Sequence, residues 1–597
     1  MQTETGSTPE KAGLPLILFA AVVQGWSLYG LHLAIKNHHW PATDQPWLIA
    51  LYALAVFVPL TLQLLARHAR NPALWGLGAL LAAAYFYFGW HYGGSVSSGG
   101  AEPLRGADQH VSLAFLLTVL WLLALPFAQG RLAAGRWTVE YGSLFADAWR
   151  NKLMLAEAAL FTGIFWLLLF LWQMLFHMLG IDYFRELFEE PVFIYPVTSL
   201  TFGCALHLIG SIERLTSVVL EQLLNVLKWL GLLAGVILAL FTVALVFKLP
   251  GLVFTGHKAI GAAWLLWLTA VMVLLLNAAY RDGSVPMPYP KWIAQFLRFV
   301  VPLTVIVSLT ALYALATRAQ HYGLTVGRVW AFVVAGAALL YSAGYSAAAF
   351  RRGPWLGGIA RVNVLAALAL IAVIAAALTP LLSPYRLAAD SQFKMVMAKG
   401  LEAADEQRNT ALHYLRFDSG RYGRAKLEEL TQLHAGPNAA DIRRRAEDML
   451  AQTSSWAASR VVVDIPAMLA KLRIFPVGRM LDRDLIDKLT ADLGKPGNVF
   501  DYDRWSNAAV GIYVDLNGDG LEEFVFLTSI RGVVYENRAG SWKLVGYTQS
   551  RPVDPRPMTD FDTAIAGELA KGNMSAIRPK WNELSIGGRV FVVNPRD

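Results

Sequence analysis

The chain has 597 residues, of which 56% are hydrophobic and only 16% are charged, against roughly 25% charged residues in an average soluble domain. The charge deficit is concentrated in residues 1–385, which consist mainly of apolar runs, whereas the remainder has the composition of a soluble protein. This pattern excludes a wholly soluble protein. It predicts an all-α polytopic membrane domain followed by a water-soluble domain.

The net charge and the cysteine content exclude two further interpretations. The net charge of +8 fits basic loops between apolar runs and does not indicate nucleic-acid binding, so we expect no nucleic-acid partner. The single cysteine, Cys204, lies inside an apolar run, and a single cysteine excludes an intramolecular disulfide. We interpret Cys204 as a small core residue.

Eleven apolar runs are each long enough to cross about 30 Å of hydrocarbon, which predicts a lipid bilayer as the surroundings of this domain. The residues before the first run lack a strongly basic segment and a clear cleavage site, so we interpret this run as a retained helix. The runs cover residues 14–35, 47–65, 73–92, 111–127, 153–179, 192–212, 229–247, 259–280, 299–316, 329–350 and 362–382.

Basic residues are concentrated in alternate loops, which predicts the orientation in the membrane. The loops after the second, fourth, eighth and tenth runs are rich in arginine and lysine, whereas the loop after the fifth run is acidic. Because basic loops face the cytoplasm, we expect a cytoplasmic N-terminus and an extracytoplasmic C-terminal region. Residues 135–152 and 212–228 interleave aromatic and charged residues, which predicts helices lying flat at the membrane surface.

Polar residues inside the apolar runs are candidates for a transport path. His177 and His207 are the two histidines of this kind that we single out. The alternative interpretation is that each isolated polar side chain forms a hydrogen bond to a neighbouring helix, which is common in membrane proteins.

The loop after the ninth run has the sequence R-x-x-x-Y-G-L-T-x-x-R, from Arg318 to Arg328. Tyr322 and Gly323 favour a tight turn, and Thr325 is suited to cap the next helix. Arginines on the predicted outer face oppose the usual charge bias, so we expect them to have partners. Arg318, Tyr322, Thr325 and Arg328 are therefore interpreted as an interdomain clamp or, alternatively, as a ligand site.

This segment resembles the hallmark of a domain-of-unknown-function family of polytopic bacterial inner-membrane proteins. Residues 148–152, 175–188, Ser391-Gln392 and 414–423 are also similar to that family. The resemblance covers about residues 10–430. It implies a helical protein of the bacterial inner membrane, but it implies no reaction or ligand. In that membrane, the orientation expected from the loop charges places the C-terminal region in the periplasm.

The chain after the last run divides into two regions. Residues 386–455 have helical spacing, and we expect them to form a helical neck on the transmembrane domain of residues 1–385. Residues 456–597 contain short β-branched and aromatic runs separated by turns, together with one helical segment. They predict a soluble extracytoplasmic α+β domain with a small antiparallel sheet.

The segment from Asp515 to Glu523 has the pattern of a calcium-binding loop. A hard cation needs oxygen ligands, which here are the side chains at positions 1, 3, 5 and 9 and the carbonyl at position 7: Asp515, Asn517, Asp519, Glu523 and Leu521. Position 12 is Phe526, so an EF-hand is excluded. The segment resembles a single integrin-type propeller repeat, and we expect a structural Ca²⁺. The alternative is a hairpin turn, because Asn-Gly and Asp-Gly favour turns.

These observations favour a non-enzymatic envelope scaffold or binding protein, whose outer domain contacts another envelope protein or a cell-wall component. The alternative function is a transporter or flippase for a small molecule or lipid. We expect no enzymatic activity, because the sequence contains no G-x-S-x-G, H-E-x-x-H, P-loop or paired-cysteine motif. A membrane glycosyltransferase stays open as a third possibility, although the first outer loop offers only one acid, Asp44.

Overall fold

A computed structural model of the chain forms two compact units, Met1–Ala458 and Ser459–Asp597, each of which is described by itself. The neck therefore belongs to the same unit as the membrane helices. The structure describes residues 13–97, 106–137, 140–255, 261–284, 287–351, 355–402, 410–434, 438–452, 469, 472–493, 510–527, 531–538, 540–549, 569–571, 584–586 and 589–591.

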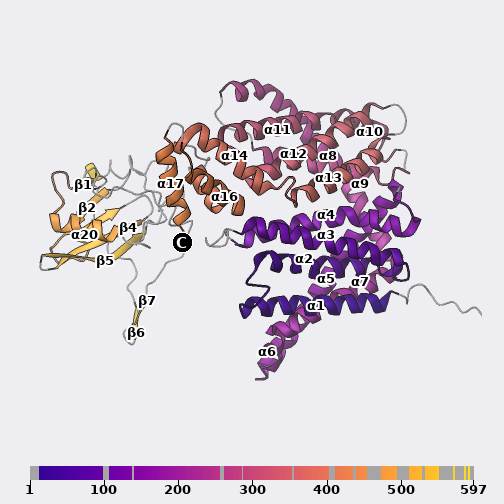
Figure 1. The fold of residues 1–597 in the computed structure, drawn as a ribbon, viewed down its shortest axis with the longest axis horizontal. Helices are drawn as coiled ribbons and strands as arrows, with labels where there is room; N and C mark the ends of the chain where they lie inside the picture. Colours follow the sequence, from indigo (N-terminus) through magenta and orange to yellow (C-terminus); the bar gives the residue numbers. More distant parts are fainter. Residues whose placement is uncertain are drawn as a thin grey trace, which may run out of the picture. The chain divides into compact units, whose positions relative to one another are not determined.

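Within the described residues, eleven helical stretches are long and apolar enough to cross a membrane, which confirms the predicted polytopic domain (Figure 1). Each corresponds to one predicted apolar run. The helices that form them are α1 (Leu14–Lys36), α2 (Gln45–Leu64), α3 (Pro72–Val96), α4 (Gly106–Ala134), α5 (Tyr141–Met178), α7 (Pro191–Ser211), α8 (Glu213–Thr255), α9 (Ala262–Tyr280), α10 (Lys291–Val300) with α11 (Leu303–Tyr322), α12 (Val326–Phe350) and α13 (Ile359–Ala377). Two short elements, η2 (Ala66–His68) and α6 (Tyr183–Glu189), lie in loops.

The predicted ends of two spans were wrong. From Tyr141 and Glu213 onward, the segments expected to lie flat at the surface belong to the same continuous helices as the spans, α5 with 38 residues and α8 with 43. No proline lies at either expected boundary, so the helical hydrogen bonding continues through it. The ninth run, in contrast, is divided between α10 and α11 at Val301 and Pro302, because proline has no N–H to donate.

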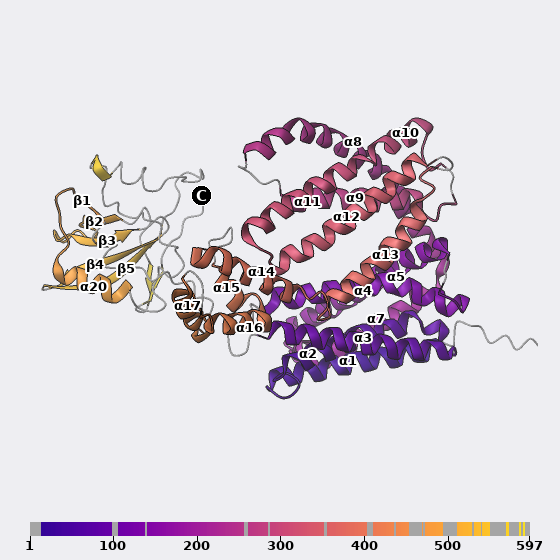
Figure 2. The same cartoon turned by 45° about the horizontal axis from the view of Figure 1, so that its top comes forward.

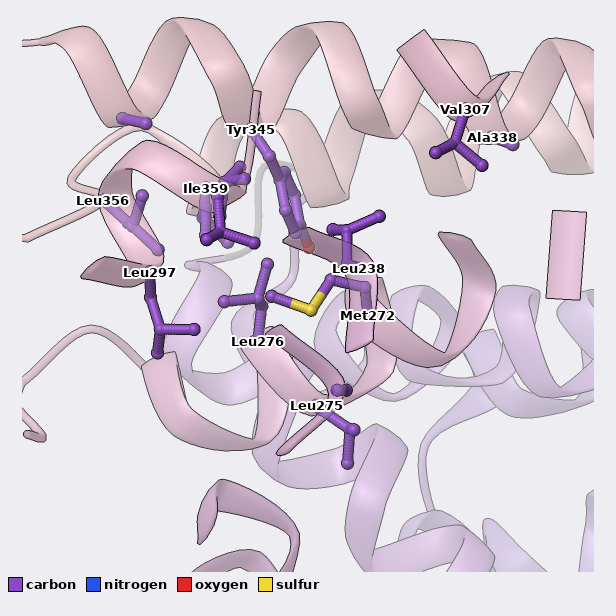
Figure 3. Close-up of a cluster of buried hydrophobic side chains, with 14 of the residues drawn as sticks. Leu238, Met272, Leu275, Leu276, Leu297, Val307, Ala338, Tyr345, Leu356 and Ile359 are labelled. Carbon is purple, nitrogen blue, oxygen red and sulfur yellow. The ribbon is translucent and has the colours of Figure 1, made fainter. Parts of the chain in front are cut away.

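The described membrane helices pack around two large clusters of buried side chains and a smaller one between α5 and α7. One cluster joins α8 to α12, and Figure 3 shows Met272 between Leu238 and Leu276, with the Tyr345 side chain pointing toward them. The other cluster joins α1 to α4 and includes Ile374 of α13. Figure 2 shows α13 between the two groups of helices. Helix α13 thus contributes side chains to both large clusters, Ile359 to one and Ile374 to the other.

The neck consists of helices that follow α13 directly: α14 (Pro384–Lys399), η3 (Gly400–Glu402), α15 (Ala411–Phe417), α16 (Gly420–Thr431) and α17 (Ala439–Ala451). They share a small core in which Leu415, Leu427, Leu430 and Ala446 are fully buried. In α16 and α17 the apolar residues recur on one helix face, which is the spacing from which the neck was predicted.

The second unit contains a five-stranded sheet in the order β1 (Arg473–Phe475), β2 (Val510–Val514), β3 (Glu523–Leu527), β4 (Arg531–Arg538) and β5 (Ser541–Gln549). Strands β2 to β5 are antiparallel, as predicted, whereas β1 pairs parallel to β2. Helix α20 (Arg483–Leu493) packs Leu485 and Leu489 against Phe524 and Phe526. A separate hairpin joins β6 (Leu584–Ile586) and β7 (Arg589–Phe591). The unit is therefore a small mixed α+β domain.

Gly89 provides a test of the packing between α2 and α3. A Cβ atom at this buried glycine would lie 2.8 Å from the Ala50 Cα, so the Gly89→Ala variant must push the helices apart. Such overpacking costs about 1–3 kcal/mol. We expect a lower thermal unfolding midpoint in detergent. Gly76→Ala is the matched control, because Gly76 lies on the exposed side of the same helix with no atom within 4 Å. Equal midpoints for both variants would contradict this packing.

Candidate functional site at the neck junction

The turn between α11 and α12 is built by the Tyr-Gly-Leu-Thr segment. Gly323 ends α11 with φ +71°, a left-handed conformation that glycine adopts without steric cost. Thr325 begins α12, and its hydroxyl accepts a hydrogen bond from the Arg328 amide at 3.3 Å. The predicted helix cap is therefore confirmed.

Arg328 binds the turn that precedes it. Its Nη1 donates to the Gly323 carbonyl at 2.9 Å and to the Tyr322 carbonyl at 3.4 Å. Its guanidinium also lies 5.8 Å from the centre of the Tyr322 ring, a distance that suits a cation–π contact. Arg318 lies half-buried on α11, one turn before Tyr322. Arg328, near the start of α12, thus provides hydrogen-bond donors for the carbonyls at the C-terminal end of α11.

The neck supplies further partners to the same turn. Gln392 of α14 is 4% exposed, and its Nε2 donates to the carbonyls of Tyr322 at 3.1 Å and Leu324 at 2.9 Å. The neighbouring Ser391 hydroxyl accepts from the Leu324 amide at 2.8 Å. A Cβ atom at Gly323 would lie 2.8 Å from Gln392 Nε2, so the turn requires a glycine there.

Tyr414 of α15 completes the contact. Its hydroxyl accepts a hydrogen bond from the Val326 amide at 2.8 Å. Burial raises the pKa of Tyr414 well above its ordinary value, so the phenol stays neutral at physiological pH. Lys399 at the end of α14 also donates to the His321 carbonyl at 2.8 Å. We call this set the neck junction: Arg318–Arg328 with Ser391, Gln392, Lys399 and Tyr414.

A second contact joins the neck to the end of α3. A Cβ atom at Gly420, at the start of α16, would lie 1.9 Å from the Ser95 carbonyl oxygen. The Tyr422 hydroxyl lies 3.4 Å from Nε2 of His91, which is buried. Arg421 donates to the Tyr422 hydroxyl at 3.0 Å and lies over the same ring. The neck is therefore attached to two membrane helix ends.

The two histidines proposed for a transport path lie at opposite ends of the α5–α7 pair. His177 ends α5, where its Nδ1 lies 2.5 Å from an Asp182 carboxylate oxygen, and both side chains are exposed. His207 lies toward the far end of α7, about 24 Å along that helix from Pro191. It is three residues from Gly210, at which an added Cβ atom would lie 3.4 Å from Cε of Met154 in the first half of α5. The structure does not bring the two histidines together.

Several polar side chains inside the spans are paired across helices. Gln63 donates to Gln24 at 3.2 Å, and Gln129 and Asn151 exchange two hydrogen bonds at 3.1 and 2.8 Å. Asn363 donates to Asn277 at 2.6 Å and accepts from Tyr345 at 2.6 Å. These polar groups stabilise contacts between helices, which is the alternative interpretation considered for such residues.

The Asp515 loop joins β2 and β3, so the predicted strand–loop–strand arrangement is confirmed. The Asp515 carboxylate accepts from the amides of Gly518 at 2.6 Å and Gly520 at 3.0 Å. Glu523 is 3% exposed and accepts from the Leu516 amide at 2.7 Å. These contacts fold the acidic side chains inward over the loop.

Asn517 connects two of the predicted calcium ligands. Its Nδ2 donates to Asp519 at 3.0 Å and to Glu523 at 2.9 Å, so a polarised N–H₂ group lies between two carboxylates. The Leu521 amide donates to Asp519 at 2.8 Å. Among the described residues, no group of three or more His, Cys, Asp or Glu side chains is arranged to hold a metal ion. The loop geometry equally satisfies the hairpin-turn interpretation.

Comparisons of the chain with protein-family models, with curated proteins and with solved structures find no match. The resemblances to an inner-membrane family and to a propeller repeat thus stay predictions from the residues. What the structure adds is that the Tyr-Gly-Leu-Thr turn, Ser391-Gln392 and Tyr414, which carry the family resemblance, meet in space at the neck junction.

Replacing Gln392 by leucine tests the neck junction. The Gln392→Leu variant keeps the side-chain volume but leaves the Tyr322 and Leu324 carbonyls without this donor, and each such loss costs about 1–3 kcal/mol. We expect the thermal unfolding midpoint of the detergent-solubilised protein to fall by several degrees. Lys394→Leu, at an exposed position of the same helix, is the matched control and should shift stability by about 0.5 kcal/mol at most. An unchanged midpoint for Gln392→Leu would contradict the clamp.

Proposed function

We propose that the chain is a non-enzymatic scaffold or binding protein of the bacterial inner membrane. The observation that carries the proposal is the neck junction, in which side chains of α14 and α15 bind backbone groups of the turn between α11 and α12. Such contacts fix the neck on the helix ends and hold it as a rigid platform. A rigid platform suits the binding of an envelope protein or a cell-wall component.

The alternative, a transporter or flippase, has less support. It requires a polar or lipid-open path that contains His177 or His207, and the two histidines lie at opposite ends of their helix pair. The polar residues Gln24, Asn277 and Asn363 are used in contacts between helices. A transport site needs polar groups that are available to a ligand, whereas these groups already have partners.

The arrangement of charged loops supports an N-terminus in the cytoplasm and a neck on the periplasmic side. Arg67 of the loop after α2 and Arg150 at the start of α5 both lie near the Asp147 carboxylate, at 3.9 and 3.5 Å. Arg298 of α10 donates to the Arg351 carbonyl at 2.8 Å. These basic segments belong to loops on the side opposite the neck junction, as the positive-inside rule requires for this orientation.

We further propose that Ca²⁺ binds the Asp515 loop and stabilises the second unit. Asp515, Asn517, Asp519 and Glu523 supply side-chain oxygens within one loop, and Leu521 supplies a carbonyl. The Asn517 N–H₂ group bridges two carboxylates in the position that suits a cation. Metal binding would require a half-turn of the Asn517 amide, which presents its oxygen to the metal and gives up the hydrogen bond that this oxygen accepts from the Asp519 amide at 2.8 Å.

Calorimetric titration of the full-length protein with Ca²⁺ tests this proposal. We expect saturable binding by the wild-type chain and its loss in Asp519→Ala. The Asp484→Ala variant, which removes an exposed carboxylate of α20 outside the loop, should bind normally. Ca²⁺ at about 100 times its dissociation constant should stabilise the folded domain by roughly 2.7 kcal/mol. Absence of binding by the wild-type chain would leave the loop as a hairpin turn.

Photocrosslinking in living cells tests the scaffold function. A photoreactive residue replacing Glu447, on the exposed face of α17, should form a reproducible adduct with one envelope component. The adduct should persist in His207→Ala and be lost in Gln392→Leu, because the second change releases the neck. An active alkaline-phosphatase fusion after Asp597 is the control for the orientation. Failure to form any adduct, or an effect of His207→Ala on it, would argue against the scaffold.

A further inference from the structure

A small cavity lies where the neck meets the membrane helices. It is lined by the end of α3, the start of α12, the end of α13 and the start of α14. Its volume is about 10 Å³, which is close to the space that one buried water molecule needs. On its wall, the hydroxyls of Tyr92 and Tyr385 lie 3.3 Å apart and form a hydrogen bond with each other.

Two other polar side chains of the cavity wall are almost completely buried. His91 is 3% exposed, and its Nδ1 has no hydrogen-bond partner among the described residues. Ser383 is 1% exposed and begins α14 without its hydroxyl capping the helix. The Leu378 carbonyl interacts with the imidazole but does not reach hydrogen-bond geometry at Nδ1. Because buried polar groups in proteins normally have partners, these groups favour a small polar ligand between them.

The other ring nitrogen of His91 determines what Nδ1 requires. The Tyr422 hydroxyl lies 3.4 Å from Nε2, and this hydroxyl also accepts a hydrogen bond from Arg421 at 3.0 Å. Because a guanidinium can only donate, the hydroxyl proton of Tyr422 is available for Nε2. A neutral imidazole that accepts at Nε2 carries its own proton on Nδ1. The cavity is lined by His91 but not by Tyr422, so the N–H group lies on the cavity side of the ring and requires an acceptor there.

We propose that this cavity binds one water molecule, which joins α3 to the neck. The water oxygen accepts the Nδ1–H of His91, and its two protons are donated to the Leu378 carbonyl and the Ser383 hydroxyl. Leu378 follows the last residue of α13, where helix carbonyls lack partners inside the helix. A bare cation is disfavoured, because the wall presents an N–H donor to the cavity. This inference is independent of the scaffold function.

Magic-angle-spinning NMR of the full-length protein in lipid bilayers, with isotope-labelled histidine, tests the proposal. The chain has 12 histidines, and the signals of His91 are those missing from the His91→Gln variant. At neutral pH we expect a neutral His91 ring with its proton on Nδ1, and a cross-peak between this proton and water. A wild-type spectrum without that cross-peak would mean that His91 binds the Leu378 carbonyl directly, and a proton on Nε2 would contradict the derived hydrogen-bond direction. Either result would overturn the proposal.

The place of the water is tested by Ala377→Val, which enlarges a buried side chain of the cavity wall. This variant should lose the water cross-peak, and its thermal unfolding midpoint should fall by several degrees, because His91 Nδ1 loses its partner. Ala372→Val is the matched control at an exposed position of the same helix, and it should keep both the cross-peak and the midpoint. A cross-peak that persists in Ala377→Val would place the water outside this cavity and overturn the proposal.

Discussion

Four backbone groups in the turn between α11 and α12 obtain their hydrogen-bond partners from the neck. The carbonyls of Tyr322 and Leu324 bind Gln392, the Leu324 amide binds Ser391, and the Val326 amide binds Tyr414. Helix ends leave such groups without partners inside the helix, and leaving them buried and unpaired is costly. The fold of the neck and the geometry of this turn therefore depend on each other.

This dependence explains why a polar, arginine-containing loop is tolerated at the end of a hydrophobic bundle. Arg328 binds two carbonyls of its own turn through Nη1, and its guanidinium lies over the Tyr322 ring. Within the membrane helices, polar side chains such as Gln129 and Asn151 are likewise paired with each other. These polar groups of the first unit join one element to another.

The features that could be predicted from the sequence are those with a local signal. Apolar length located the eleven spans, the Thr325 side chain indicated the start of α12, and alternation located the strands on both sides of the Asp515 loop. The ends of α5 and α8 were missed, because an amphipathic pattern does not distinguish a helix that lies flat from one that continues into a span.

The contacts of the neck junction could not be predicted from local sequence patterns. The sequence suggested that Arg318–Arg328 form a clamp, but it did not identify the partners, because Gln392 lies 70 residues from Tyr322 and Tyr414 lies 88 residues from Val326. The parallel pairing of β1 with β2 was missed for the same reason. Contacts of this kind depend on the tertiary path of the chain. The periodicity of residues within either segment carries no information about that path.

Amide hydrogen exchange at Leu324 and Val326 in the full-length protein tests the central claim most directly. Both amides lie outside helical hydrogen bonding and donate only to side chains of the neck, Ser391 and Tyr414. A clamped neck predicts exchange as slow as in the helices on either side. Exchange at the rate of an open loop would show that the neck is not fixed to the membrane helices. This result would contradict the proposed rigid platform and the scaffold function that depends on it.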